Sequence, residues 1–164
     1  MSSPEAAPFI LGAGLPIALG ADHAGVTLKN HLANALVAAG RDILDLGTNG
    51  TASVDYPDFG HAVAAAVLDG RAGAGILVCG SGIGMSITAN RHHGIRCVLA
   101  HDVTTARLAR QHNDANILAL GERVIGLQVA LDAMAIFLAT PFEGGRHTRR
   151  IERIDAADAQ GTSP

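Results

Sequence analysis

The stretch GILVCGSGIGMS, residues 75–86, decides the fold of this chain. It opens with Ile76, Leu77 and Val78, a short apolar run without alternation that is typical of a strand covered on both faces of a parallel sheet. Three glycines spaced two residues apart follow Cys79 and predict a tight loop that leads into a helix. The loop is therefore expected at the carboxyl end of a strand, where open α/β sheets bind their ligands.

Cys79 ends this strand just before the predicted helix. Main-chain N–H groups at a helix N-terminus stabilise anions, so Cys79 is a candidate thiolate base or nucleophile. The alternative is a small buried core residue, which is the commoner use of cysteine. Two known signatures do not fit. A cysteine phosphatase loop needs an arginine where Met85 stands, and a dinucleotide-binding G-x-G-x-x-G pattern would end on Met85 or Ile87 instead of glycine.

Apolar strands and amphipathic helical segments alternate along the whole chain. Strands are expected at residues 17–21, 43–46, 76–78, 94–100 and 117–120, and helices at 26–39, 57–70, 104–112, 127–138 and 146–155, with a short helix after the glycine loop. This alternation predicts a Rossmann-like three-layer α/β/α sandwich with a five-stranded parallel sheet. We expect one domain over residues 16–158, a flexible N-terminal tail at 1–15 and a frayed C-terminus at 159–164.

Composition excludes several classes of function. The formal net charge of −3 gives no reason to expect nucleic acid or an anionic membrane as a partner. The apolar run at 9–21 lacks a preceding Lys or Arg, so neither export nor a membrane span is expected. Cys79 and Cys97 make no disulfide framework, which favours the reducing cytoplasm. The eight histidines form neither an H-x-x-x-H pair nor a Cys/His cluster, so no metal or other cofactor is expected.

Polar residues gather near the ends of several predicted strands. Because the carboxyl ends of parallel strands meet at one edge, we expect these residues to converge there. They are Asp22 and His23 after the first strand, Cys79 after the third, Glu122 and Arg123 after the fifth, and His112 and Asn113 on the approach to the fifth. Taken singly, Asp22 and His23 also fit a helix cap, and His112 fits a cation at a helix C-terminus.

The last predicted helix is rich in arginine. Arg146 and Arg150 are four residues apart, so they project from the same face and suit a phosphate dianion held by two guanidinium groups. Two other interpretations stay open. The helix fits a solvated basic face balanced by Glu143 and Glu152, and it also fits a contact between two copies of the chain.

Several motifs occur together in a fixed order. They are GADHAG (20–25), DYP (55–57), CGSGIGMSITANR (79–91), GIRCVLAHD (94–102), RQHNDANILALGERVIG (110–126) and FEGGRHTRRIERI (142–154). In these motifs the chain resembles ribose-5-phosphate isomerase type B, a family that also includes galactose-6-phosphate isomerase subunits. The resemblance covers residues 16–155.

The resemblance implies a role for each matching residue. Cys79 matches the base that removes the proton from C2 of the sugar, and Asp22 matches a residue that moves protons between O1 and O2. His112 matches the histidine that opens the furanose ring, with Ser81 as its helper. The matching substrate- and phosphate-binding residues are His23, Tyr56, Gly80, Gly82, Ile83, Gly84, Asn113, Arg123, Arg146 and Arg150. The family is dimeric or tetrameric, with a shared active site and the C-terminal helix at the dimer interface.

The expected activity is therefore the interconversion of D-ribose 5-phosphate and D-ribulose 5-phosphate through a cis-enediolate, without a cofactor. One alternative is the same chemistry on allose 6-phosphate or galactose 6-phosphate. Another is a non-catalytic sensor of a phosphosugar or nucleotide on the same fold.

Overall fold

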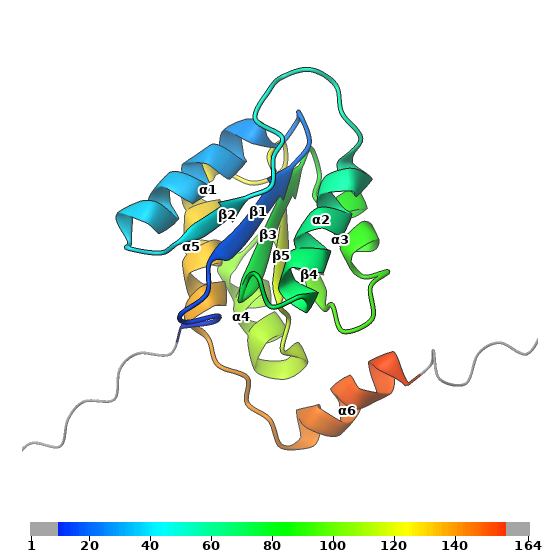
Figure 1. Ribbon diagram of the computed structural model, residues 1–164. Coiled ribbons are helices and arrows are strands. Elements are labelled where there is room, and N and C mark those ends of the chain that lie inside the picture. Colours follow the sequence, from blue (N-terminus) through cyan, green and yellow to red (C-terminus); the bar gives the residue numbers. More distant parts are fainter. Residues whose placement is uncertain (1–9, 157–164) are drawn as a thin grey trace, which may run out of the picture.

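The computed structural model describes residues 10–156, most of which form a three-layer α/β/α sandwich (Figure 1). The central sheet is parallel, with the strand order β2-β1-β3-β5-β4. The strands are β1 Ile17–Ala21, β2 Ile43–Asp45, β3 Ala74–Cys79, β4 Cys97–Leu99 and β5 Ile117–Gly121. The helices are α1 Val26–Ala38, α2 Tyr56–Leu68, α3 Ile83–Ala89, α4 Val103–Asn113, α5 Leu127–Ala139 and α6 Arg146–Asp155. The predicted fold class is confirmed.

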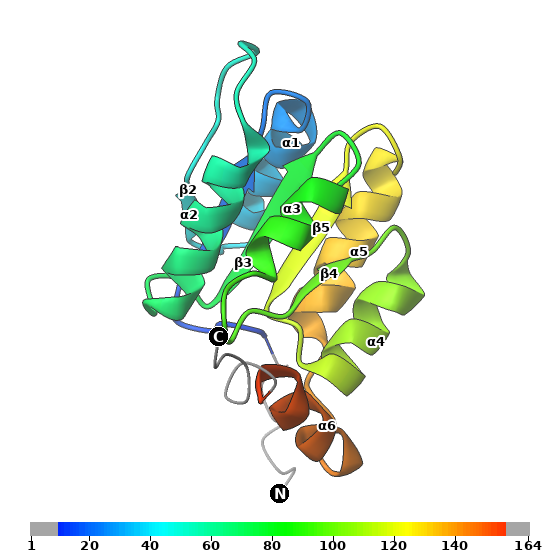
Figure 2. The same ribbon diagram turned by 90° about the vertical axis from the view of Figure 1, so that its right-hand side faces the viewer.

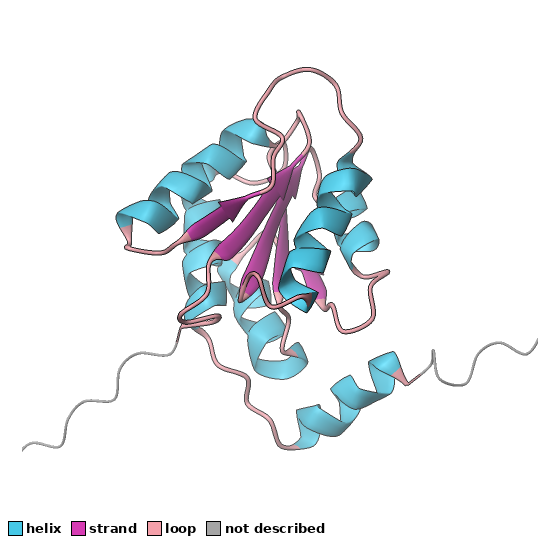
Figure 3. Cartoon of the chain, viewed as in Figure 1, coloured by secondary structure: helices cyan, strands magenta, loops and turns pink. Residues whose placement is uncertain are grey.

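Helices cover both faces of the sheet, as the cartoon coloured by secondary structure shows (Figure 3). Alternate residues of each strand point to opposite faces. Ile76 of β3 lies in the core beneath α1, α4 and α5, whereas Leu77 lies in the core beneath α2 and α3 (Figure 2). All six residues of β3 are buried, which explains why this strand is an uninterrupted apolar run in the sequence.

The two edge strands are shorter than predicted. Strand β4 was expected at 94–100 but spans only Cys97–Leu99, and β2 ends at Asp45 instead of residue 46. Gly94 adopts a positive φ of 85°, and the Arg96 N–H donates to the Asn116 side chain at 2.8 Å instead of to a neighbouring strand. A strand with one neighbour has fewer main-chain partners to extend it, so local turns shorten it.

The N-terminal boundary also differs from the expectation. Residues 10–15 belong to the predicted tail, yet the Leu11 N–H donates to the Leu138 carbonyl at 2.7 Å, and Arg41 donates to the Leu11 carbonyl at 3.1 Å. The packed unit therefore begins before residue 16. Residues 1–9 and the predicted frayed end at 159–164 lie outside the described residues.

Helix α6 stands apart from the sandwich, at the end opposite the carboxyl ends of the strands (Figure 1). It packs against α4, and the segment before it is tied to α4 by the Glu143 N–H, which donates to the Gln111 carbonyl at 3.1 Å. At its far end the Asp155 carboxylate lies 3.8 Å from the His93 ring. Among the described residues, no helix has the length and apolar character needed to cross a membrane.

Candidate active site

A cavity of about 640 Å³ opens at the carboxyl ends of β1 and β3, beside the loop that follows β5. It is the place where a parallel sheet of this kind holds its ligand. The residues predicted from the sequence that line it are Asp22, His23, Tyr56, Cys79, Gly80, Ser81, Ile83, Gly84 and Arg123. Gly82 lies in the same loop, immediately before α3.

The glycine loop directs a main-chain donor at the thiol. The Gly82 N–H donates to Cys79 Sγ at 3.1 Å, and Cys79 is only 4% exposed. Gly82 has a φ of 78°, and a Cβ there would lie 2.8 Å from the Leu120 carbonyl carbon, so glycine is required. An N–H aimed at sulfur from the start of a helix stabilises a thiolate. The loop therefore suits Cys79 to act as a base.

Tyr56 closes one side of this cavity. A Cβ on Gly84 would lie 2.6 Å from the Tyr56 ring, so the absence of a side chain at Gly84 lets the ring approach the loop. Tyr56 is the first residue of α2 and is 40% exposed. A ligand in the cavity would meet an aromatic wall with a phenolic hydroxyl at its edge.

The loops after β1 and β5 complete the rim. The Arg123 N–H donates to the Gly80 carbonyl at 3.0 Å, which brings Arg123 beside the glycine loop. Asp22 is 7% exposed, and its carboxylate accepts the Ala24 N–H at 3.0 Å. His23 Nδ1 accepts the Val54 N–H at 3.2 Å, so its Nε2 carries the proton in the neutral ring and remains available as a donor.

The remaining predicted residues lie at the other end of the molecule. Helix α4 starts after the carboxyl end of β4 and returns to the amino end of β5, so His112 and Asn113, in its last turn, lie far from Cys79. Arg146 and Arg150 belong to α6, which is at the same end (Figure 1). The expectation that all these side chains converge on one edge is therefore not met within one chain.

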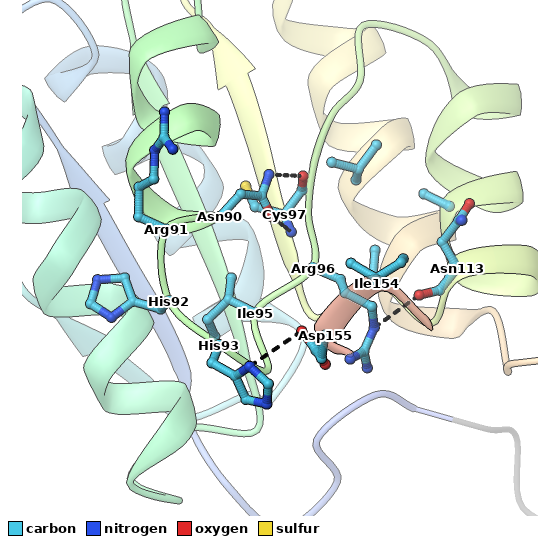
Figure 4. Close-up of a pocket in the computed structure, with 13 residues that line it drawn as sticks. Asn90, Arg91, His92, His93, Ile95, Arg96, Cys97, Asn113, Ile154 and Asp155 are labelled. Carbon is cyan, nitrogen blue, oxygen red and sulfur yellow. Dashed lines mark hydrogen bonds and ion pairs between the residues drawn. The ribbon is translucent and has the colours of Figure 1, made fainter. Parts of the chain in front are cut away.

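Asn113 lines a second cavity of about 450 Å³ between β4 and the end of α6 (Figure 4). The Arg96 side chain donates to the Asn113 carbonyl at 3.0 Å, which fixes the end of α4. Cys97 also lines this cavity, and burial raises the pKa of its thiol from 9.0 to about 12. Cys97 therefore stays protonated at neutral pH and is unsuited to act as a base.

His112 is part of a cluster that the sequence did not reveal. Its ring stacks on that of His147, with centroids 4.5 Å apart and planes 11° apart. Glu143 Oε2 lies 3.9 Å from His112 Nε2 and 3.7 Å from His147 Nε2. The spacing of four between Glu143 and His147 is the available signal, but in the sequence Glu143 equally fits a carboxylate that balances the arginines.

The electrostatics of this cluster keep His147 neutral. Burial lowers the pKa of His147 below its usual value of 6.5, and the nearby His112 and Arg146 charges lower it further. Glu143 acts in the opposite direction, and its effect is smaller. At neutral pH the His147 ring is therefore an uncharged stacking partner.

The cluster has the donor types of a metal site, since one atom each of His112, Glu143 and His147 lies within 4.8 Å of the others. A metal ion binds a histidine nitrogen in the plane of the ring. The two ring planes here are nearly parallel, so one ion cannot lie in both while the rings stay stacked. The cluster is therefore not a preformed metal centre.

Comparison with known proteins gives a consistent result. The family model described as Ribose/Galactose Isomerase matches residues 17–154. Ribose-5-phosphate isomerase B of Escherichia coli is 44% identical over 142 residues, which cover 87% of this chain and 95% of that protein. D-Erythrulose-4-phosphate isomerase of Pectobacterium atrosepticum is 41% identical over 141 residues, which cover 85% and 93%. The structure of Clostridium thermocellum ribose-5-phosphate isomerase B superposes with a TM-score of 0.88 at 47% identity, covering 89% of this chain and 99% of that chain.

The fold, the thiol-bearing cavity and these matches define a sugar-phosphate isomerase of the aldose–ketose type. The chain belongs to the ribose/galactose isomerase family. The family resemblance stated from the sequence motifs is thereby confirmed.

Proposed function

We propose that this chain interconverts D-ribose 5-phosphate and D-ribulose 5-phosphate. The observation that carries the proposal is the Cys79 thiol, which receives the Gly82 N–H in a cavity shared with Asp22 and Arg123. An aldose–ketose isomerisation by proton transfer needs a base, stabilisation of an enediolate oxygen and an anchor for the phosphate. The relatives that are ribose-5-phosphate isomerases B make the five-carbon sugar the first choice.

The proposed reaction begins with the open-chain aldose. The Cys79 thiolate removes the proton from C2, and the electron pair moves to form the cis-enediolate. Main-chain N–H groups of the glycine loop at 80–84, together with Asn113, stabilise the developing oxyanion. Asp22 moves a proton between O1 and O2, and Cys79 returns the proton to C1. A positioned base contributes about 10²–10⁴ in rate, and one oxyanion donor about 10²–10³.

We further propose that a second copy of the chain completes the site. The proposed reaction uses four further residues for ring opening, oxyanion binding and phosphate binding: His112, Asn113, Arg146 and Arg150. All four lie at the end of the sheet opposite Cys79. In a homodimer, or a tetramer of such dimers, this end of one copy meets the cavity of the other. Helix α6 then lies at the interface, and its arginines join His23 and Arg123 around the phosphate.

The experiment is incubation of the purified protein with ribose 5-phosphate in D₂O with EDTA, followed by NMR. We expect ribulose 5-phosphate to form and deuterium to enter C2 of the aldose pool. Absence of both would contradict the proposed substrate. Values of kcat/KM for ribose, allose and galactose phosphates then separate the five-carbon from the six-carbon assignment. Tight phosphosugar binding without any exchange would instead identify a sensor.

We also propose a cytoplasmic location. Cys79 and Cys97 are both free thiols, and the proposed base must remain reduced to work. Fractionation of cells expressing the protein would test this, with activity in the periplasmic fraction as the contradicting result.

A further inference from the structure

The proposed ring-opening residue, His112, is held by two side chains to which neither the family resemblance nor the comparisons give a role. One is His147, which is 6% exposed and stacks face to face on the half-exposed His112 ring. His147 lies in the first turn of α6, and its main-chain N–H donates to the Gly144 carbonyl at 3.1 Å. A buried ring in the first turn of a helix gives the half-exposed His112 ring one preferred plane.

The second is Glu143, whose Oε2 faces both imidazoles through their Nε2 atoms. Of the two rings, His112 is the more exposed and is therefore the one that can meet a substrate, and the carboxylate lies 3.9 Å from its Nε2. A carboxylate beside one ring nitrogen fixes the tautomer with the proton on that nitrogen and leaves the other nitrogen to accept a proton. These two distances, 3.9 Å and 3.7 Å, are longer than hydrogen bonds, and catalytic hydrogen bonds commonly tighten when substrate binds.

We propose that Glu143 and His147 are positioning residues for ring opening: His147 fixes the plane of the His112 imidazole, and Glu143 fixes its tautomer. This inference rests on the proposed function. In the step concerned, His112 Nδ1 takes the proton of the anomeric hydroxyl, the C1=O bond forms and the C1–O4 bond breaks. The electron pair goes to O4, which takes the proton back from the imidazolium. The products are the open-chain aldehyde and a neutral His112.

The step can be separated from isomerisation because ribulose 5-phosphate is acyclic. Its C5 hydroxyl carries the phosphate, so the ketone at C2 cannot close a five-membered ring. Exchange of the C1 hydrogen of ribulose 5-phosphate with D₂O therefore requires Cys79 and the oxyanion donors but no ring opening. Turnover of ribose 5-phosphate, which is mainly cyclic, requires both steps.

The test compares these two rates by NMR in the full-length protein. We expect Glu143→Gln and His147→Ala to lower kcat/KM for ribose 5-phosphate by at least about tenfold while the C1 exchange rate of ribulose 5-phosphate stays within about twofold of wild type. His147→Phe, which restores a stacking ring, should recover part of the loss. Glu152→Gln, which removes an exposed carboxylate from the same helix, is the matched control and should change neither rate.

Two results would overturn the inference. One is an equal loss of both rates in Glu143→Gln, which would place the effect on folding, assembly or proton transfer at carbon. The other is an unchanged kcat/KM for ribose 5-phosphate in both Glu143→Gln and His147→Ala. Failure of the proposed function looks different, because the wild-type protein would then not turn over ribose 5-phosphate at all.

Discussion

The two ends of the sheet differ in the chemistry that they provide. The carboxyl end supplies a thiol, main-chain N–H groups and a buried carboxylate, which suit proton transfer at carbon. The opposite end supplies stacked histidines and the arginines of α6, which suit ring opening and anion binding. Neither end by itself has the parts that an isomerase of cyclic sugar phosphates needs. This separation supports the proposal that two copies of the chain together make one functional unit.

The largest effect is expected at the carboxyl end. Cys79→Ala removes the proposed base and should lower kcat by about 10²–10⁴ without loss of the fold. Cys97→Ala is the control, because its thiol stays protonated and lies outside the Cys79 cavity. It should keep full activity. Steady-state kinetics and circular dichroism measure the activity and the fold of both variants. Near-wild-type turnover by Cys79→Ala would show that the Cys79 thiol is not the base.

At the opposite end, Arg146→Ala should raise KM for ribose 5-phosphate. Loss of a charge-assisted hydrogen bond of about 1.5–3 kcal/mol corresponds to roughly 10–150-fold in affinity. Arg149→Ala is the matched control, because Arg149 is exposed on the same helix but was not assigned to the phosphate set. Equal KM values for Arg146→Ala and Arg149→Ala, with the dimer intact by ultracentrifugation, would show that α6 does not bind the phosphate and has only a structural role.

The glycine loop allows a test of stability. Gly82→Ala forces a Cβ against the main chain of β5 at a positive φ and should destabilise the fold by about 1–3 kcal/mol. It should also disturb the donor to Cys79. Gly50→Ala, where nothing lies within 4 Å of the new Cβ, is the control and should change Tm little. A thermal melt that ranks the two variants equally would show that the loop is less tightly packed than the structure indicates.

The smallest expected effect is on the pH dependence of folding stability, through His147 at the end of the sheet opposite Cys79. The folded-state pKa of His147 is lowered, so the unfolded chain binds this proton more readily than the folded chain does. The contribution of His147 to stability is therefore complete above about pH 6.5 and is lost as the pH falls below it. His147→Phe should flatten this part of the stability–pH curve, measured by urea unfolding. A steeper curve in the variant would show that folding raises the pKa of His147 instead of lowering it.

The sequence predicts the carboxyl end well for a physical reason. Strand β3 is buried on both faces and therefore apolar throughout, and the glycines after it are required by backbone conformation and close packing. These constraints act over a few residues, so the local pattern shows them. The motif order also predicted the family.

At the opposite end of the sheet, the arrangement of the side chains depends on contacts between residues far apart in the sequence. The position of His112 follows from the direction in which α4 runs, and its stacking on His147 joins residues 35 positions apart, which no local periodicity reveals. The short edge strand β4 is likewise set by the positive φ of Gly94 and by the Asn116 side chain, which accepts the Arg96 N–H, and not by its apolar residues. The expected convergence with Cys79 rests on nearness to predicted strands, but His112 and Asn113 precede β5 and so lie at its amino end, whereas Cys79 ends β3 at its carboxyl end.

Mixed dimers test the central claim, that two copies share each site. Cys79→Ala and His112→Asn subunits are each expected to be nearly inactive with ribose 5-phosphate as homodimers. After co-expression at equal levels, half of the dimers are mixed and each mixed dimer has one intact site, so about a quarter of wild-type activity should return. If Cys79 and His112 instead work within one chain, every site in the mixture carries a defect, and activity no greater than that of the separate variants would contradict the account.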